Sequence, residues 1–253
     1  MVIDEAVELD QAWTRTAPAR VAREISVCGV FDAIVRTYAR VSVTGREHLD
    51  SIDGPVIFVA NHSSHVDTPV LLRSLPGRWR RRTAVTAAAD YFYANRLLAA
   101  AVSLAFGTVP LERRAEAGRA RAVAGLKPLI DSGWSLVVFA EGTRSRDGRV
   151  GSLRSGAATL ATECGLPIVP VFLAGTHAAM PVGAGWMRRP RGGGRFARHS
   201  IAVCFGPPIR PDSSAGPAAM MEVARSFMES CGAETAPPPD GADRRAAIAE
   251  TAL

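Results

Sequence analysis

The stretch PVIFVANHSSHVD, residues 55–67, joins an apolar run to a polar loop that carries two histidines and an aspartate. A continuous apolar run of this length predicts a strand that is buried on both faces of a sheet. Four further apolar runs follow, and helical patterns separate them: RTAVTA (82–87), SLVVF (135–139), LPIVPVFL (166–173) and SIAVCF (200–205). Strands that alternate with helices predict an α/β layered fold with a largely parallel central sheet flanked by helices.

The length of 253 residues suits one α/β domain of this kind. Composition divides the chain into a mobile lead-in at 1–18, a folded domain at 19–230 and a disordered, Pro/Ala-rich tail at 231–253. Within the domain, the apolar periodicity predicts helices at 21–40, 68–75, 91–105, 115–132, 156–164 and 217–230.

The chain carries a formal net charge of +6, and nearly all of its positive charge is arginine because Lys127 is the only lysine. Arginine suits bidentate contact with phosphate, and a basic surface favours anionic lipid, an anionic cofactor or nucleic acid. Aromatic residues make up only 6% of the chain, which disfavours a nucleic-acid protein built on base stacking. We therefore expect no nucleic-acid partner. A hydrophobic content of 47% excludes disorder of the whole chain.

No membrane-spanning helix is expected. The uncharged stretch 164–187 is long enough to span, but Pro167, Pro170 and Pro181 would break a helix there. Residues 20–40 instead form an amphipathic pattern that suits a helix lying on a membrane surface. The acidic N-terminal segment does not resemble a secretory signal, and the four cysteines form no CxxC pair. We expect a cytoplasmic protein that is peripheral on the inner face of the cell membrane.

The loop after the first apolar run suggests an acid–base pair of histidine and aspartate. His62 and Asp67 are five residues apart, about 140° around a continuous helix, so they face each other only if His62 lies on the turn and Asp67 begins a helix. Pro69 would then fall in the first helical turn, where proline is tolerated. Spacing does not distinguish His62 from His65 as the base. Asp67 could instead cap the helix, and a metal site at these three residues is a weaker alternative because no further ligand cluster stands out.

Two further segments carry polar groups. GTVPLER (107–113) is interpreted as the end of an apolar helix followed by an irregular segment that presents Arg113. FAEGTRSRDG (139–148) follows a predicted strand, and no Walker, GxGxxG or GxSxG motif occurs in the chain. This segment could form an anion cradle from Gly142, Thr143, Arg144 and Ser145, although a plain polar turn is the alternative.

Taken in order, these motifs resemble the glycerolipid acyltransferases of the lysophosphatidate acyltransferase type. The resemblance runs from about residue 40 to 210, and Ala140 stands where the family usually has proline. A single NHxxxxD motif is weak, whereas four motifs in the family's order are a strong signal. The matching blocks are NHSSHVD (61–67), GTVPLER (107–113), FAEGTRS (139–145) and IVPVFLAGT (168–176).

The resemblance implies an acyltransferase-like fold and an activity. His62 takes the base position, Asp67 orients it, and the acceptor hydroxyl attacks an acyl thioester directly, without a protein nucleophile. The donor would be acyl-CoA or acyl carrier protein, the acceptor a lysophospholipid such as 1-acylglycerol-3-phosphate, and the product phosphatidate for phospholipid biosynthesis. No cofactor and no metal are implied. The acceptor site would comprise Arg113, Glu141, Gly142, Thr143 and Arg144, with Asn61 and Pro170 in supporting positions. A carboxylate cannot bind phosphate itself, so Glu141 would orient Arg144 or accept a hydrogen bond from the glycerol.

Two arginine clusters favour an anionic membrane surface as a partner. One is Arg78–Arg82 and the other lies within residues 188–198; Trp79 and Trp186 beside them could reach the lipid interface. The same arginines could instead meet coenzyme A phosphates or an acidic carrier protein, or form a solvated face. Another lysophospholipid or a non-phosphate hydroxyl compound is an alternative acceptor. A non-catalytic basic membrane- or nucleic-acid-binding protein on this scaffold is the alternative of a different class.

Overall fold

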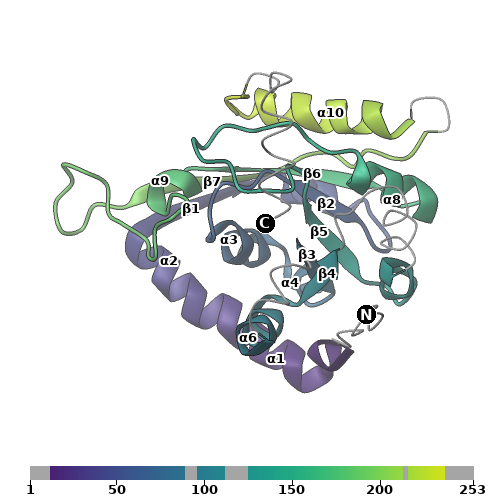
Figure 1. The fold of residues 1–253 in the computed structure, drawn as a ribbon, viewed down its shortest axis with the longest axis horizontal. Coiled ribbons are helices and arrows are strands. Elements are labelled where there is room, and N and C mark those ends of the chain that lie inside the picture. The colour runs from purple at the N-terminus through teal and green to yellow at the C-terminus, as the bar shows by residue number, and fades with distance from the viewer. Residues whose placement is uncertain (1–11, 89–95, 112–124, 213–215, 237–253) are drawn as a thin grey trace, which may run out of the picture.

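A computed structural model describes residues 12–88, 96–111, 125–212 and 216–236. Its centre is a seven-stranded sheet in which every neighbouring pair is parallel except β6–β7. The predicted layered α/β fold is confirmed (Figure 1). Across the sheet the order is β1 (Ala39–Thr44), β7 (His199–Phe205), β6 (Ile168–Ala174), β2 (Ile57–Ala60), β5 (Ser135–Phe139), β3 (Thr83–Ala88) and β4 (Thr108–Leu111).

Helices cover both faces of this sheet (Figure 1). One face carries α8 (Gly156–Cys164) and α10 (Gly216–Ser230). The opposite face carries α1 (Ala17–Ile25), a π-helical turn η2 (Ser26–Phe31), α2 (Asp32–Tyr38), α3 (Asp67–Ser74) and α6 (Arg96–Phe106). Shorter helical turns are η1 (Ala12–Arg15), η3 (Arg46–Leu49), α4 (Gly77–Arg80) and α9 (Thr176–Ala179).

Strand β2 shows why the apolar runs predicted the sheet. Its side chains alternate between two hydrophobic cores, as expected for a strand covered by helices on both faces. Ile57 and Val59 pack into the core beneath α8 and α10, whereas Phe58 and Ala60 pack into the core beside α3 and η2. All four side chains are fully buried, so β2 is fixed at the centre of the sheet and the loop after it starts from a rigid position.

All five predicted strands are present, and the two strands that were missed, β1 and β4, are the edges of the sheet. The helix predicted at 21–40 is confirmed up to Tyr38 as α1, the π-helical turn η2 and α2, and only its last two residues differ, because β1 begins at Ala39. The segment predicted to be irregular after Gly107 contains β4. Pro110 lies within β4, and an edge strand tolerates proline because one side of its backbone has no partner strand.

The helices predicted at 68–75, 156–164 and 217–230 are confirmed as α3, α8 and α10. The helix predicted at 91–105 is confirmed in its described part, as α6, and most of the one predicted at 115–132 lies outside the described residues. Helical turns already begin at Ala12, within the expected lead-in. Beyond α10, Glu234 and Ala236 form backbone hydrogen bonds to Val150, and residues 237–253 of the expected tail lie outside the described part.

The first arginine cluster, Arg78–Arg82, is only partly exposed to solvent. Trp79 is buried and lies edge-on to Phe58 with ring centroids 5.9 Å apart, so the expectation that it reaches a lipid interface is wrong. Arg80 forms a two-pronged ion pair with Glu24 of α1, with both N–O distances 2.9 Å. Within the described ranges, no helix is both long and apolar enough to cross a membrane.

Candidate active site

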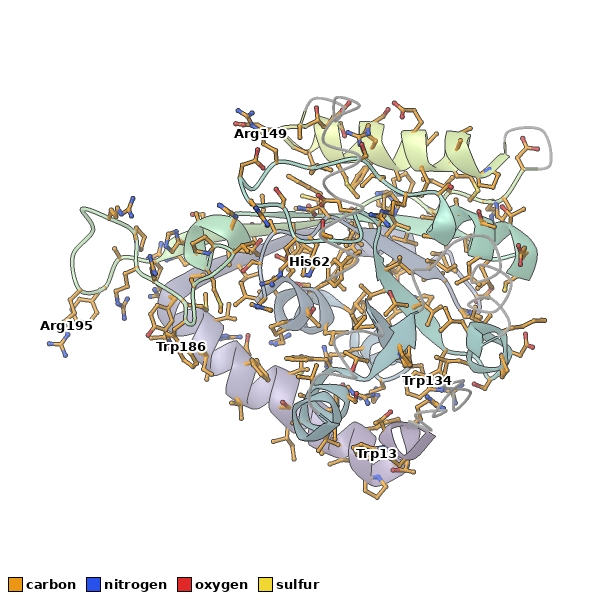
Figure 2. All side chains as sticks on the ribbon, in the orientation of Figure 1. Trp13, His62, Trp134, Arg149, Trp186 and Arg195 are labelled. Carbon is orange, nitrogen blue, oxygen red and sulfur yellow. The ribbon has the colours of Figure 1, made fainter. Side chains whose placement is uncertain are left out.

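The predicted functional loops meet because β6, β2 and β5 are neighbours and run parallel. Parallel strands end at the same edge of a sheet, so the segments that follow them gather there. The loop 61–66 follows β2, the segment 140–145 follows β5, and Gly175 and Thr176 follow β6. Figure 2 shows His62 between the central strands and α3.

His62 and Asp67 form the pair that their spacing allowed. His62 lies on the turn after β2, Asp67 begins α3, and His62 Nδ1 lies 2.8 Å from Asp67 Oδ2. The same Asp67 oxygen accepts the backbone N–H groups of Ser63 (2.7 Å) and Ser64 (2.8 Å). The carboxylate therefore faces back into the loop, and the N-cap residue of α3, Val66, makes no side-chain cap. The helix-cap alternative for Asp67 is not what the structure shows.

This arrangement fixes the orientation of the His62 ring. Asp67 is completely buried, while 19% of the His62 side chain is exposed. The imidazole also stacks on Phe139, the last residue of β5, with centroids 4.0 Å apart and planes 19° apart. Nδ1 is engaged by Asp67, and Nε2 has no hydrogen-bond partner among the described residues. The free nitrogen of an oriented imidazole is the group that a general base requires.

His65 does not share this environment. Its side chain is exposed and has no hydrogen bond to Asp67 in the described structure. The part of the His65 ring that faces the protein is desolvated, and this desolvation, the Arg144 cation and His62 lower the pKa of His65 below its usual value, because each disfavours a positive charge on the ring. The structure thus brings His62, and not His65, to the carboxylate.

Glu141 holds the backbone of the histidine loop. One carboxylate oxygen accepts the N–H of His62 at 2.8 Å, and the other accepts the N–H of Gly151 at 2.9 Å. Burial raises the pKa of Glu141, and these two backbone hydrogen bonds oppose that rise. Ser145 N–H in turn donates to His62 O at 2.8 Å. The segment after β5 therefore forms hydrogen bonds with both the backbone N–H and the backbone carbonyl of His62. The sequence motifs place Glu141 in the acceptor site, beside Arg144, and do not predict these backbone contacts.

The remaining residues of this segment present a basic surface beside the histidine loop. Gly142 adopts φ +78°, and a Cβ atom there would lie only 3.0 Å from Nε of Arg154, so the guanidinium packs directly on the glycine. Arg154 was missed because it lies outside the quoted motifs, and only the fold brings it to Gly142. Thr143 is exposed and Arg144 is half-buried, with no ion pair to another described residue. Arg113 lies outside the described residues.

Asn61 and Pro170 have structural partners. The Asn61 amide continues the pairing of β2 with β6, since it donates to Leu173 O at 3.0 Å and accepts Leu173 N–H at 2.8 Å. Pro170 lies within β6 opposite Val59, and its carbonyl accepts the N–H of Gly206 at 2.8 Å. Asn61 therefore fixes the end of β2 from which the loop 61–66 starts, whereas Pro170 lies inside β6.

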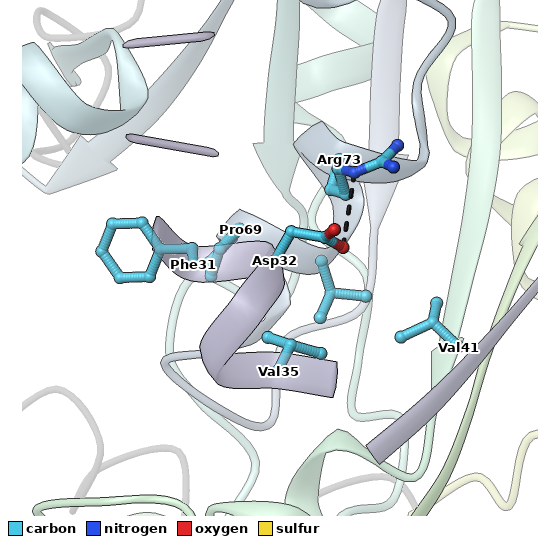
Figure 3. A pocket seen from close by; sticks show the side chains of 7 residues that line it. Phe31, Asp32, Val35, Val41, Pro69 and Arg73 are labelled. Carbon is cyan, nitrogen blue, oxygen red and sulfur yellow. Dashed lines mark ion pairs between the residues drawn. The ribbon is translucent and has the colours of Figure 1, made fainter. Parts of the chain in front are cut away.

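A small cavity opens on the flank of α3, between η2, α2 and β1 (Figure 3). Arg73 and Asp32 form an ion pair at 3.4 Å in its wall, and most other lining side chains are apolar. None of the predicted site residues lines this cavity, so it is separate from the histidine loop. Its lining consists of Phe31, Asp32, Val35, Val41, Pro69, Val70 and Arg73.

Comparison of the sequence with known protein families gives a match. Residues 40–174, more than half of the chain, match the family described as Acyltransferase. The chain belongs to the acyltransferase family. The resemblance noted in the sequence is thereby confirmed, and β2, β5, β6 and the loops after β2 and β5 all lie within the matched residues.

Several relatives of the acyltransferase carry a more specific name. It is 34% identical over 149 residues to a chloroplast 1-acyl-sn-glycerol-3-phosphate acyltransferase of Brassica napus, covering 58% of this chain and 41% of the relative. The corresponding Arabidopsis thaliana protein is 35% identical, with 58% and 39% covered. The chain thus spans about two fifths of the length of these plant relatives. The crystal structure of the 1-acyl-sn-glycerophosphate acyltransferase of Thermotoga maritima shares the fold, with a TM-score of 0.61, 22% identity, and 88% of this chain and 83% of that chain covered.

Proposed function

We propose that this acyltransferase transfers a fatty acyl group from a thioester donor to the free hydroxyl of a lysophospholipid. The observation that carries this proposal is the His62–Asp67 pair, in which a buried carboxylate holds Nδ1 and leaves Nε2 free. The acceptor that we propose first is 1-acylglycerol-3-phosphate, because the relatives described above are named for that substrate. The product would then be phosphatidate, a precursor in phospholipid biosynthesis.

In the proposed reaction, His62 Nε2 removes the proton of the acceptor hydroxyl while the oxygen attacks the thioester carbonyl carbon. Asp67 stabilises the imidazolium that forms. The tetrahedral intermediate then collapses, the carbon–sulfur bond breaks, and the departing thiolate takes up the proton from His62. Thiolate is a good leaving group, so no strong acid is needed. General-base catalysis of this type contributes about 10²–10⁴ in rate.

The acceptor phosphate is proposed to bind beside the loop 140–145. Arg144 has no ion pair within the described residues, and the Arg154 guanidinium lies against Gly142. Two arginines at this position suit a phosphate monoester, since their planar N–H groups donate in pairs to its oxygens. We propose Arg113 and Thr143 as further contacts. The described contacts of Glu141 support a role in holding the His62 loop.

The donor is proposed to be acyl-CoA or acyl carrier protein, with no cofactor and no metal. The testing experiment measures release of free thiol from each donor with lysophosphatidate, with other lysophospholipids and with no acceptor. The proposal expects thiol release that depends on the acceptor and is fastest with lysophosphatidate. Release without dependence on any hydroxyl acceptor would contradict it, and so would an absence of release with all of these compounds, as expected for a non-catalytic binding protein.

We propose further that the enzyme binds an anionic membrane surface peripherally, from the cytoplasmic side. The support comes from the arginine arm, defined as residues 181–198, which projects from the domain beyond α2 (Figure 2). The side chain of Phe196 is 82% exposed and that of Trp186 is 56% exposed. The arm is fixed to α2, because Trp186 Nε1 donates to Tyr38 Oη at 3.2 Å and Arg189 lies over the Tyr38 ring at 5.3 Å.

Exposed cations and aromatic rings on one arm suit a lipid surface of negative charge. Three arginines of the arm, Arg188, Arg191 and Arg195, are exposed and form no ion pair with another described residue. Changing these three to serine should reduce co-sedimentation with anionic vesicles, and binding should fall at high salt because the Debye length shrinks from about 10 Å at 0.1 M to about 3 Å at 1 M. Changing Arg40, Arg149 and Arg210, three exposed arginines outside both clusters, to serine removes the same charge and is the matched control. An equal loss in both variants would contradict a specific role for the arm.

A further inference from the structure

Hydrogen bonds connect helix α10 to the loop 61–66 that carries His62, although α10 lies outside the residues that match the family. It covers the face of the sheet opposite to α3 (Figure 1). Its apolar side binds the core firmly, since Met220, Met221, Ala224 and Met228 are all buried. From this fixed helix the half-buried Arg225 donates from Nη2 to the carbonyl oxygen of Gly151 at 2.6 Å.

Gly151 connects this arginine to the loop 61–66. Its N–H donates to one oxygen of Glu141 at 2.9 Å, and the other oxygen accepts the N–H of His62 at 2.8 Å. Three hydrogen bonds thus lead from Arg225 to the backbone of the proposed base. The contact at Gly151 is close, because a Cβ atom there would lie 3.1 Å from the Glu141 carboxylate.

The chain beyond α10 forms backbone hydrogen bonds with Val150, the residue before Gly151. Val150 N–H donates to Glu234 O at 2.8 Å, and Ala236 N–H donates to Val150 O at 2.9 Å. The Val150 side chain is 1% exposed, so this short pairing is anchored in the core. Val150 and Gly151 are therefore both held by the C-terminal part of the chain, one by backbone pairing and the other by the Arg225 guanidinium.

We propose that Arg225 is a positioning residue for the acyl-transfer reaction, acting through Gly151 and Glu141 on the backbone of His62. The inference rests on the proposed function of His62 as the base. The Glu141 carboxylate bonds the backbone of both His62 and Gly151, so it positions His62 well only if Gly151 is itself held in place. Arg225 supplies that fixation for Gly151, and a general base loses efficiency when its position shifts by a fraction of an ångström.

The first test compares Arg225→Ala with Arg225→Lys and with Glu222→Ala, a control at an exposed position of the same helix. Arg225→Ala should lower kcat about tenfold, the lower end of what a charge-assisted hydrogen bond contributes. The KM for the acceptor should stay within about twofold, because Arg225 touches no substrate. The lysine variant should recover part of kcat, and the control should match wild type. A rise in KM with unchanged kcat would overturn the proposal.

A double-mutant cycle tests the route through Glu141. If Arg225 acts through that carboxylate, the loss in Arg225→Ala combined with Glu141→Gln should be smaller than the product of the two separate losses. Independent roles would give losses that multiply, and this result would overturn the proposed route.

A measurement that does not depend on catalysis tests the positioning role of Arg225 separately from the proposed acyl transfer. Hydrogen exchange at the backbone amides of His62 and Gly151 should become faster in Arg225→Ala and remain at the wild-type rate in Glu222→Ala. Unchanged exchange at both amides in Arg225→Ala would overturn the positioning role, whether or not the enzyme turns over. Faster exchange in a protein that releases no thiol with any acceptor would support the positioning role and contradict only the proposed acyl transfer.

Discussion

Replacing Asp67 by asparagine tests the carboxylate behind the proposed base with a small change of shape. In the native protein one oxygen of Asp67 accepts three hydrogen bonds, from the Ser63 and Ser64 backbone N–H groups and from His62 Nδ1. The amide oxygen of asparagine still offers an acceptor to the two backbone groups. The negative charge that faces the imidazole is lost, and this charge is what stabilises the imidazolium formed during proton transfer.

The expected magnitude follows from that one charge-assisted contact. A hydrogen bond to a charged group contributes about 1.5–3 kcal/mol, and a buried carboxylate such as Asp67 is little screened by water. Loss of this amount from the transition state lowers kcat by about 10- to 150-fold. Substrate binding should change little, because Asp67 is completely buried and faces the loop rather than solvent.

The assay is acceptor-dependent thiol release, with thermal unfolding to show that the variant is folded. Asp131→Asn is the matched control, since it makes the same chemical change in an exposed residue whose ion pair is with Lys127 of the same helical segment. Combining Asp67→Asn with His62→Ala should cost no more than His62→Ala alone, because the two act as one unit. A folded Asp67→Asn variant with wild-type kcat would refute the reasoning.

Three further changes have expected outcomes. His65→Ala should keep kcat within about threefold in the thiol-release assay, since the exposed His65 does not contact Asp67 and lies outside the general-base pair. Arg144→Ala should raise the acceptor KM about 10- to 100-fold through loss of a charge-assisted phosphate contact, and an unchanged KM would favour a non-phosphate acceptor. Gly45→Ala should lower the free energy of unfolding in urea by at least about 1–2 kcal/mol, because Gly45 has φ +77° and a Cβ there would overlap Phe205 O.

Local sequence patterns predicted the central strands because those strands are buried on both faces. β2 and β6 each consist almost entirely of apolar residues, and burial on two faces permits little else. The edge strands β1 and β4 have a partner on one side only, and the exposed residues of β1 weaken its pattern. The helical periodicity of the preceding residues therefore ran on into β1 in the prediction.

The pairing of His62 with Asp67 was predictable because it depends on one short loop and a helix start. The contacts of Glu141 were not, since they join residues 79 and 10 positions apart, and both partners are backbone groups with no side-chain signal. The same holds for Arg154 on Gly142 and for Arg225 on Gly151. Such contacts follow from the order of strands in the sheet, which local patterns do not specify.

Acceptor-dependent thiol release by His62→Ala, compared with wild type, tests the central claim most directly. With an acyl thioester and lysophosphatidate at saturation, wild type should release thiol in proportion to acylated product, and the folded His62→Ala variant should be slower by about 10²–10⁴. His62 lies on a loop with its ring partly exposed, so the substitution should leave the sheet intact. A folded His62→Ala variant that releases thiol at the wild-type rate would contradict the account.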